Sequence, residues 1–298
     1  MKSRNLWSTL VGGLLGAFLV AVFLLTETPS GQAIPAFSDN YIWLMHDGRD
    51  AVVVDPGAAE PVEEALRRMG FGLSAIVLTH LHYDHCWGVP ALLKRWSVPV
   101  YGPILNDYDR ATHPPFPKPG TVPLDCVTHP VVDGDRVALS APHVDLTVIA
   151  VPGHTRGHLA FWDRLRGRVF TGDSLFAGGC GKVFDSMSVM AQSLFRLASL
   201  PDKTEVYSGH EYTLANLRFA LAVEPNNEAL HARNRAERAK RDRGEPTSPS
   251  TIALEKATNP FLRLLQPDIV RALRSRTGHE FSAPSESFEA LRNWKDVF

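Results

Sequence analysis

The sequence has few cysteines and almost no net charge. Its 298 residues include three cysteines, Cys86, Cys126 and Cys180, an odd number that argues against a disulfide framework and favours a reducing compartment. The formal net charge of -1 gives no overall attraction to nucleic acid or to an anionic membrane. We therefore expect the folded part of the chain to be cytoplasmic and to bind no nucleic acid.

Two incomplete motifs exclude further classes of protein. The run Gly178–Lys182 resembles a phosphate-binding loop, but Phe176 stands where the motif requires its first glycine, and Val183 stands where it requires Ser or Thr. The basic run from Arg233 to Arg243 has no aromatic side chains for base stacking and is interleaved with acidic residues, which is typical of a solvated helix face. No internal repeat is evident.

An apolar segment opens the chain. Residues 5–26 carry no charge, and a helix of this length would span about 30 Å, the hydrocarbon core of a bilayer. Three interpretations follow: a membrane anchor over residues 6–25, a cleaved signal peptide ending near Ala33, or a translation start placed too far upstream. Because Lys2 and Arg4 precede the segment, an anchor would leave the rest of the chain outside the cytoplasm. Membrane attachment or export is therefore the alternative to a cytoplasmic location, and residues 1–33 form a leader.

The rest of the chain predicts an α/β fold with a helical end. Short apolar runs bounded by Gly, Pro or charge predict strands at 51–54, 73–78, 144–151, 168–171 and 205–207, and helical spacing predicts a helix over 61–69. The proline-rich stretch 106–123 predicts a long surface loop. After residue 209 the pattern changes to helices at 213–223, 228–241 and 285–294. We place a domain boundary there, which gives domains over 34–208 and 209–298.

Four side chains of metal-ligand type follow the strand at 73–78 and precede a helix that is expected to begin near Trp87. His80 and His82 are two residues apart, so both can face one way in an extended loop. Asp84 and His85 are adjacent and are expected to diverge, so that one short segment supplies two neighbouring metal positions. Imidazole and carboxylate are the ligands that zinc and similar divalent ions prefer.

Three later strands end in the same way. Each apolar strand runs into a glycine, which allows a tight turn, and then into one ligand-type side chain: His154, Asp173 or His210. The candidates then number seven, namely His80, His82, Asp84, His85, His154, Asp173 and His210. A catalytic zinc usually has three protein ligands, so seven predict two ions with Asp173 shared. The ions are expected to be Zn²⁺, although the same ligands accept iron or manganese.

These motifs resemble the metallo-β-lactamase superfamily and, within it, the hydroxyacylglutathione hydrolases (glyoxalase II). The resemblance covers residues 34–298, and its more specific segments are TGDSLFAGGCGKVF (171–184), GHEYT (209–213), GEPTSPST (244–251), NPFLR (259–263) and LRNWKDVF (291–298). It implies an αββα sandwich over 34–208, which is the catalytic domain, followed by a smaller helical domain over 209–298 that binds glutathione.

The resemblance also implies a role for each site residue. It places His80, His82 and His154 on one metal, Asp84, His85 and His210 on the other, and Asp173 on both. It places five further residues against the glutathione moiety: Lys182, Phe184, Tyr212, Arg292 and Lys295. The last two are i,i+3 on a predicted helix and share a face, so the pair can hold a carboxylate of glutathione.

The activity implied is hydrolysis of S-(2-hydroxyacyl)glutathione, such as S-D-lactoylglutathione, to glutathione and a 2-hydroxy acid such as D-lactate. This is the second step of methylglyoxal detoxification. Paired metals lower the pKa of a bound water toward neutrality, and Asp84 is the candidate that orients the attacking oxygen. We expect a monomer. The alternatives are another hydrolase of the superfamily, such as a lactamase, a persulfide-oxidising iron enzyme, or a membrane-tethered metal-binding homologue without activity.

The chain departs from the family pattern at several positions. Trp87 stands where the family usually has glycine, directly beside the first ligand run. The family's Phe-Glu-Gly-Thr reads Phe184-Asp185-Ser186-Met187, and Phe184 cannot donate the hydrogen bond that a tyrosine would. These changes leave the seven ligands intact and affect the shape of the acyl pocket.

Overall fold

A computed structural model describes residues 31–104, 126–281 and 283–298. Two sequence predictions, the apolar segment 6–25 and the surface loop 106–123, lie outside these residues. Within the described ranges, no helix combines the length and the apolar character needed to cross a membrane.

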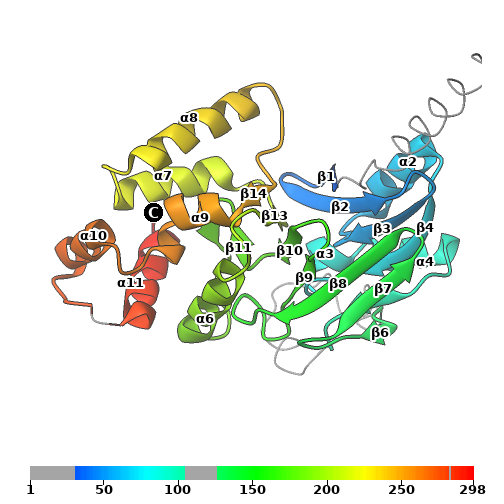
Figure 1. Cartoon of the computed structure of the whole chain (residues 1–298), viewed down its shortest axis with the longest axis horizontal. Coiled ribbons are helices and arrows are strands. Elements are labelled where there is room, and N and C mark those ends of the chain that lie inside the picture. Colours follow the sequence, from blue (N-terminus) through cyan, green and yellow to red (C-terminus); the bar gives the residue numbers. More distant parts are fainter. Residues whose placement is uncertain (1–30, 105–125, 282) are drawn as a thin grey trace, which may run out of the picture.

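Two six-stranded sheets lie face to face (Figure 1). The first sheet has the spatial order β1 (Gln32–Ala36), β2 (Asn40–His46), β3 (Asp50–Val54), β4 (Gly72–Val77), β5 (Val100–Gly102) and β6 (His129–Pro130). The second has the order β14 (Ser250–Thr251), β13 (Glu205–Ser208), β10 (Arg168–Gly172), β9 (Leu159–Asp163), β8 (His143–Ala150) and β7 (Arg136–Ser140). A separate hairpin is formed by β11 (Leu175–Phe176) and β12 (Gly179–Cys180).

Helices cover the outer face of each sheet. The helices of the N-terminal half are α2 (Ala59–Met69), α3 (Tyr83–Cys86) and α4 (Val89–Arg95). On the side of the second sheet are α6 (Met187–Ala198), α7 (Thr213–Val223), α8 (Glu228–Asp242), α9 (Ile252–Thr258), the 3-10 turn η1 (Pro260–Leu262), α10 (Pro267–Thr277) and α11 (Pro284–Asp296). Figure 1 shows α7 to α11 gathered at one end of the sandwich.

The strands separate two apolar layers because alternate side chains point to opposite faces. In β3, Ala51 and Val53 pack against α2 and α4, while Val52 and Val54 pack between the two sheets. A strand buried on both faces reads as a continuous apolar run, which is why this one was predictable from the sequence. The layers are helix, sheet, sheet and helix, so the predicted αββα sandwich with a C-terminal helical part is confirmed.

The C-terminal helices share their core with the second sheet. One apolar cluster contains Val169 of β10 and Leu194 of α6 together with Phe219 of α7 and Phe288 of α11. In addition, β14 returns to the second sheet, where it pairs antiparallel with β13. The helices after residue 209 also form a small apolar cluster of their own, with Leu217, Ala220 and Leu230, and the boundary there stays a prediction.

The ligand run contains a helix that was not predicted. The helix expected from about Trp87 is present as α4, which begins at Val89, but a further short helix, α3, precedes it and carries Asp84 and His85. Between the two helices, Gly88 donates its N–H to the Pro56 carbonyl at 2.9 Å, and a Cβ at this position would lie 2.5 Å from that oxygen.

Candidate metal centre and substrate cavity

The structure brings all seven candidate ligands to one place. They follow β4, β8, β10 and β13, four strands that belong to both sheets and end at the same edge of the sandwich. The tips of separate strands therefore meet although the residues are up to 130 positions apart, from His80 to His210.

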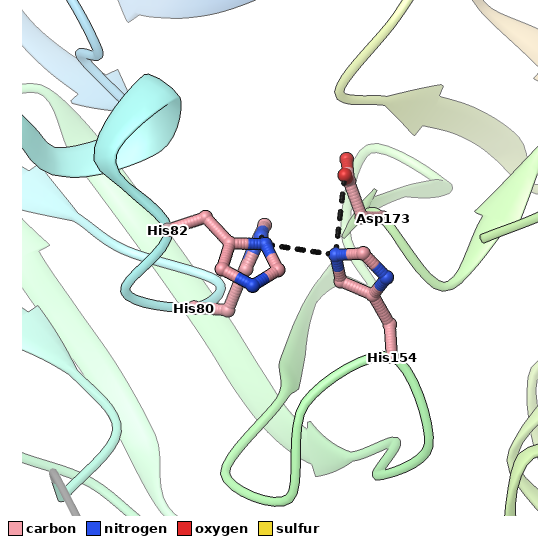
Figure 2. A group of neighbouring side chains, drawn as sticks. All are labelled: His80, His82, His154 and Asp173. Atoms are coloured by element: carbon pink, nitrogen blue, oxygen red, sulfur yellow. Dashed lines mark hydrogen bonds and ion pairs between the residues drawn. The ribbon is translucent and has the colours of Figure 1, made fainter. Parts of the chain in front are cut away.

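The first group contains three imidazoles and one carboxylate (Figure 2). His82 Nδ1 lies 2.9 Å from His80 Nε2 and 2.9 Å from His154 Nε2. Asp173 Oδ2 lies 3.4 Å from His154 Nε2. The ligand atoms of these four residues all lie within 4.8 Å of one another, which is close enough for one ion to contact them all.

The second group is Asp84, His85 and His210. His85 Nε2 lies 3.2 Å from His210 Nε2, and Asp84 Oδ2 lies 3.5 Å from the first nitrogen and 3.4 Å from the second. The expectation that Asp84 and His85 diverge is wrong for their ligand atoms, because α3 turns both side chains toward the same point. The short segment from His80 to His85 nevertheless contributes to both groups, as predicted.

Asp173 lies between the two groups. Its Oδ2 is 3.4 Å from His154 Nε2 on one side and 3.4 Å from His210 Nε2 on the other, and its Oδ1 is 3.4 Å from His85 Nε2. Oδ1 is buried and, among the described residues, accepts no hydrogen bond. A buried carboxylate oxygen in that condition is costly unless a cation contacts it, so this residue fits a position between two metal ions.

An aspartate that the sequence analysis missed orients His85. Asp55 accepts hydrogen bonds from Thr79 N at 2.7 Å and Thr79 Oγ1 at 2.6 Å, and its Oδ2 also accepts from His85 Nδ1 at 3.1 Å. Because Nδ1 of His85 is hydrogen-bonded to Asp55, its Nε2 faces the other candidate ligands. The backbone of Asp55 has φ 53, a left-handed conformation that is uncommon outside glycine. The sequence signals were an acidic residue directly after the strand 51–54 and its place in the segment VVDPG (53–57), which matches the family pattern.

Two other imidazoles are held in the same way. His210 Nδ1 donates to Asp39 Oδ1 at 2.7 Å, and His154 Nδ1 donates to the Lys182 carbonyl at 2.8 Å. A further imidazole, His158, accepts a hydrogen bond at Nε2 from Asp173 N at 3.1 Å and stacks on the His80 ring, with the ring centroids 4.5 Å apart. These contacts fix ring orientation before any metal arrives.

The glycines before the later ligands serve two different purposes. Gly153 and Gly172 have φ 138 and 48, so the predicted turns need a residue without Cβ there. Gly209 does not have a positive φ. A Cβ at Gly209 would instead lie 2.6 Å from Asp173 Oδ1 and 2.7 Å from His85 Cε1, so glycine is needed because the ligands crowd against it.

The electrostatics of the centre favour cations. Burial alone would raise the pKa of Asp173, but the neighbouring His210 and His85 outweigh it and hold that pKa well below its usual range. Burial opposes the charged form of His210 as well, yet Asp173 and then Asp84 raise its pKa to about 10. The carboxylates are therefore anionic, and they stabilise positive charge on or beside the imidazoles. Imidazole nitrogens and carboxylate oxygens in this arrangement can hold divalent metal ions.

A cavity of about 310 Å³ opens on this centre. Lys182, Phe184 and Tyr212 line it together with the ligands, and the Tyr212 ring stacks on His210 at 4.8 Å. A larger cavity of about 590 Å³ lies against α10 and α11, where none of the seven ligands lines it.

The remaining two predicted substrate contacts do not line the smaller cavity. Arg292 is buried in α11, donating through Nη1 to the Cys180 carbonyl at 3.2 Å and through Nη2 to Asp296 at 2.7 Å. Lys295 Nζ donates to the Ala215 carbonyl at 3.3 Å. The two residues lie on one helix with the predicted i,i+3 spacing, but the partner of Arg292 is a carboxylate of the chain itself.

Comparison with known proteins decides the family. The model of the metallo-beta-lactamase superfamily matches residues 36–210, and that of the hydroxyacylglutathione hydrolase C-terminus matches residues 211–298. The hydroxyacylglutathione hydrolase of Alkalilimnicola ehrlichii is 50% identical over 267 residues, which cover 89% of this chain and 97% of that protein. The one from Cupriavidus metallidurans is 45% identical over 278 residues, with 90% and 98% covered. The chain belongs to the hydroxyacylglutathione hydrolase family.

Solved structures agree on the fold. This family member resembles the BLEG-1 B3 metallo-beta-lactamase with a TM-score of 0.58 at 23% identity, covering 78% of this chain and 99% of that one. It resembles TTHA1623 in a di-iron-bound form with a TM-score of 0.53 at 27% identity, covering 78% and 100%. The likeness to the lactamase concerns the fold alone.

Proposed function

We propose that this chain is a metal-dependent thioester hydrolase that converts S-(2-hydroxyacyl)glutathione and water into glutathione and a 2-hydroxy carboxylate. The observation that carries the proposal is the position of Asp173 between two ligand groups at the floor of a cavity. Membership of the hydroxyacylglutathione hydrolase family supports the substrate class, with S-D-lactoylglutathione as the expected substrate. The alternatives from the superfamily are not favoured, because the curated relatives at 40–50% identity carry the hydrolase name.

Two divalent ions, most simply Zn²⁺, fit the donor set. His80, His82 and His154 would hold one ion and Asp84, His85 and His210 the other, with Asp173 contributing to both. When bound, such ions supply Lewis-acid activation of water and of the thioester carbonyl, so the protein needs no separate strong base.

Asp84 is the residue that we assign to the attacking water. Its Oδ2 accepts a hydrogen bond from Asn40 Nδ2 at 3.0 Å, and the residue lines the cavity. Burial alone would raise the pKa of Asp84, but His85 and then His210 and Asn40 lower it well below its usual range. An anionic carboxylate in this place accepts a hydrogen bond from the water and directs its lone pair toward the thioester carbon.

The cavity wall formed by Lys182, Phe184 and Tyr212 is assigned to the glutathione part of the substrate. Lys182 supplies an exposed positive charge for a carboxylate, and Phe184 and Tyr212 supply aromatic faces beside it. Arg292 and Lys295 are proposed as further carboxylate contacts, as the family resemblance implies. The leaving group is a thiolate, whose thiol pKa of about 8.5 makes its departure less demanding than that of an amine.

We propose that the enzyme acts as a monomer in the cytoplasm. The described part of one chain contains the full ligand set and the cavity, and its three cysteines are buried and form no disulfide there. Attachment to a membrane through residues 6–25 is the competing proposal. Cell fractionation of the full chain distinguishes the two proposals. Recovery of the protein in the membrane fraction would contradict the cytoplasmic location and support attachment.

The activity is tested with the purified full chain and S-D-lactoylglutathione. We expect hydrolysis that stops after dialysis against a chelator and returns when Zn²⁺, Fe²⁺ or Mn²⁺ is added back. A metal-loaded protein that leaves the thioester intact would contradict the proposed function. Undiminished hydrolysis after metal removal would contradict the proposed role of the metals.

A further inference from the structure

The β11–β12 hairpin connects the metal centre to the substrate wall. Asp173 lies two residues before β11, Phe176 of β11 lines the cavity, and Gly181 and Lys182 follow β12 directly and also line it. The hairpin itself is minimal, because its two strands pair only Leu175 with Cys180 and Phe176 with Gly179. A two-stranded hairpin is marginally stable at best on its own, so something else must hold this one in place.

Side chains from the C-terminal helices supply that support. Asn216 of α7 donates to the Ala177 carbonyl at 3.1 Å. Asn259, at the end of α9, donates to the Gly179 carbonyl at 2.9 Å and to the Phe176 carbonyl at 3.4 Å.

Two charged side chains complete the set. Glu255 of α9 accepts the Gly178 N–H through Oε2 at 2.8 Å, and Arg292 of α11 donates to the Cys180 carbonyl at 3.2 Å. Each of the five consecutive residues from 176 to 180 therefore has a backbone group bonded to one of four helical side chains. Of these elements, α7 contacts β12 directly, and Figure 1 shows α7, α9 and α11 in the same end of the molecule.

These supporting side chains are buried and fixed in their own right. Glu255 and Asn259 are fully buried, and Asn216 is 4% exposed. The Glu255 carboxylate is paired with Arg233 at 2.5 Å and also accepts a hydrogen bond from Ser250. A buried ion pair is weak evidence for stability, but it does hold the carboxylate in one geometry, with Oε2 directed at the hairpin.

The glycines of the hairpin turn allow this close approach. Gly178 has φ 70, and a Cβ there would lie 2.9 Å from Leu217 Cδ2. A Cβ on Gly179 would lie 2.6 Å from Asn216 Cγ. The hairpin backbone is thus packed directly against α7 with no room for a side chain between them.

We propose that Asn216, Glu255 and Asn259 are positioning residues for substrate binding, which act by holding the β11–β12 hairpin and with it Phe176 and Lys182. The inference deepens the proposed function and rests on it. Most of the metal ligands, by contrast, do not contact the hairpin: His85 and His210 are oriented by Asp55 and Asp39. Only His154 is held from its end, through the Lys182 carbonyl. Loosening the hairpin should therefore weaken substrate binding more than it affects the chemical step.

The test is Asn216→Asp, which keeps the size of the side chain and removes its donor to Ala177. A carboxylate oxygen would then face a buried carbonyl oxygen, so we expect the KM for S-D-lactoylglutathione to rise about tenfold. The kcat should change less than twofold, and the metal content should stay the same. If this variant does not fold, Gly179→Ala displaces Asn216 from the other side and should raise KM in the same way. Arg292 is left unchanged, because it is also a proposed substrate contact.

Asn227→Ala is the matched control. Asn227 caps α8 through Leu230 N at 3.1 Å and donates to the Ala257 carbonyl at 3.1 Å, so its loss weakens the same helical part without touching the hairpin. We expect a lower Tm and an unchanged KM. An equal rise in KM in this control would overturn the proposal, because general loosening would then explain it. An unchanged KM in Asn216→Asp would also overturn the proposal. A fall in both kcat and metal content in Asn216→Asp would do the same.

Hydrogen exchange separates this inference from the proposed function. In Asn216→Asp the amides of residues 175–181 should exchange faster than in the unmodified protein, while those of Asn227→Ala should not. If the unmodified protein fails to hydrolyse the thioester, the proposed function fails. Exchange at the hairpin would still report whether the helices hold it, and unchanged exchange in Asn216→Asp would contradict the support itself.

Discussion

The candidate metal centre and the proposed substrate wall of the cavity are built in different ways. Each candidate ligand lies at or near the end of a strand, and several are oriented by a single carboxylate or carbonyl close by. The Lys182 side of the wall follows the small β11–β12 hairpin, whose backbone is bonded to side chains from three helices that come later in the chain. From this difference we predict that chemistry and substrate binding are separable in this fold. Changes to the centre should act on metal content and kcat, and changes to the wall should act on KM.

The largest effect is expected for Asp173→Asn. This residue contacts both ligand groups, so the change removes a negative charge from both proposed metal positions at once. Thioester hydrolysis should be abolished, and the metal content, measured by elemental analysis, should fall. Asp202→Asn, at an exposed aspartate paired with Lys256, serves as the control and should keep activity and metal. Retention of both in Asp173→Asn would refute the shared-ligand assignment.

Asp55→Asn should weaken metal binding although it replaces none of the seven candidate ligands. The amide cannot accept from Thr79 N, Thr79 Oγ1 and His85 Nδ1 together, so His85 loses the contact that aims it. We expect metal affinity, measured by competition with a chelator, to fall about 10- to 100-fold. Asparagine is chosen because it tolerates the left-handed backbone at this position better than alanine does. Asp47→Asn, in an exposed turn, is the control, and equal metal affinities in all three proteins would remove the assigned role.

Lys182→Ala tests the wall. Its carbonyl holds His154, and a change of side chain leaves that contact in place. Loss of the positive charge should raise the KM for S-D-lactoylglutathione about tenfold, since a charge-assisted contact is exchanged for water. Steady-state kinetics should show kcat within about twofold of the original. A fall in kcat with KM unchanged would place Lys182 in the chemical step and erase the distinction between the two regions.

The smallest effect is expected for Phe184→Tyr. The Phe184 ring lines the cavity, and its centroid lies 5.4 Å from that of the His154 ring. An added hydroxyl would supply the hydrogen-bond donor that a tyrosine has at this position and Phe184 lacks. The KM should fall about threefold, near the lower end of what one hydrogen bond contributes. Phe195→Tyr, on the exposed face of α6, controls for the added hydroxyl and should leave KM as it was. A higher KM in Phe184→Tyr would indicate that the wall has no room for the hydroxyl.

The sequence allowed the gathering of the seven ligand-type side chains to be predicted because its signals are local. An apolar strand, a glycine and a ligand-type residue follow one another within about ten positions, and this pattern recurs at His154, Asp173 and His210. The short helix α3 and its break from α4 at residues 87–88 were missed, since Gly88 bonds there to the carbonyl of Pro56, which lies about 30 positions earlier.

The support of the hairpin could not be predicted from the sequence. Asn216 and Ala177 are 39 positions apart, and Arg292 and Cys180 are 112 apart. An asparagine within a helix has many possible partners, and only the packing of α7 against the hairpin selects one. Asp39 was missed for the same reason, because it meets His210 across 171 positions.

The central claim is that one carboxylate, Asp173, is shared by two metal ions. Anomalous diffraction from crystals of the zinc-loaded full chain tests it most directly. We predict two peaks of similar height, one among His80, His82 and His154 and the other among Asp84, His85 and His210, with Asp173 in contact with both. A single peak at full occupancy, or two peaks of which only one lies within bonding distance of Asp173, would contradict the account.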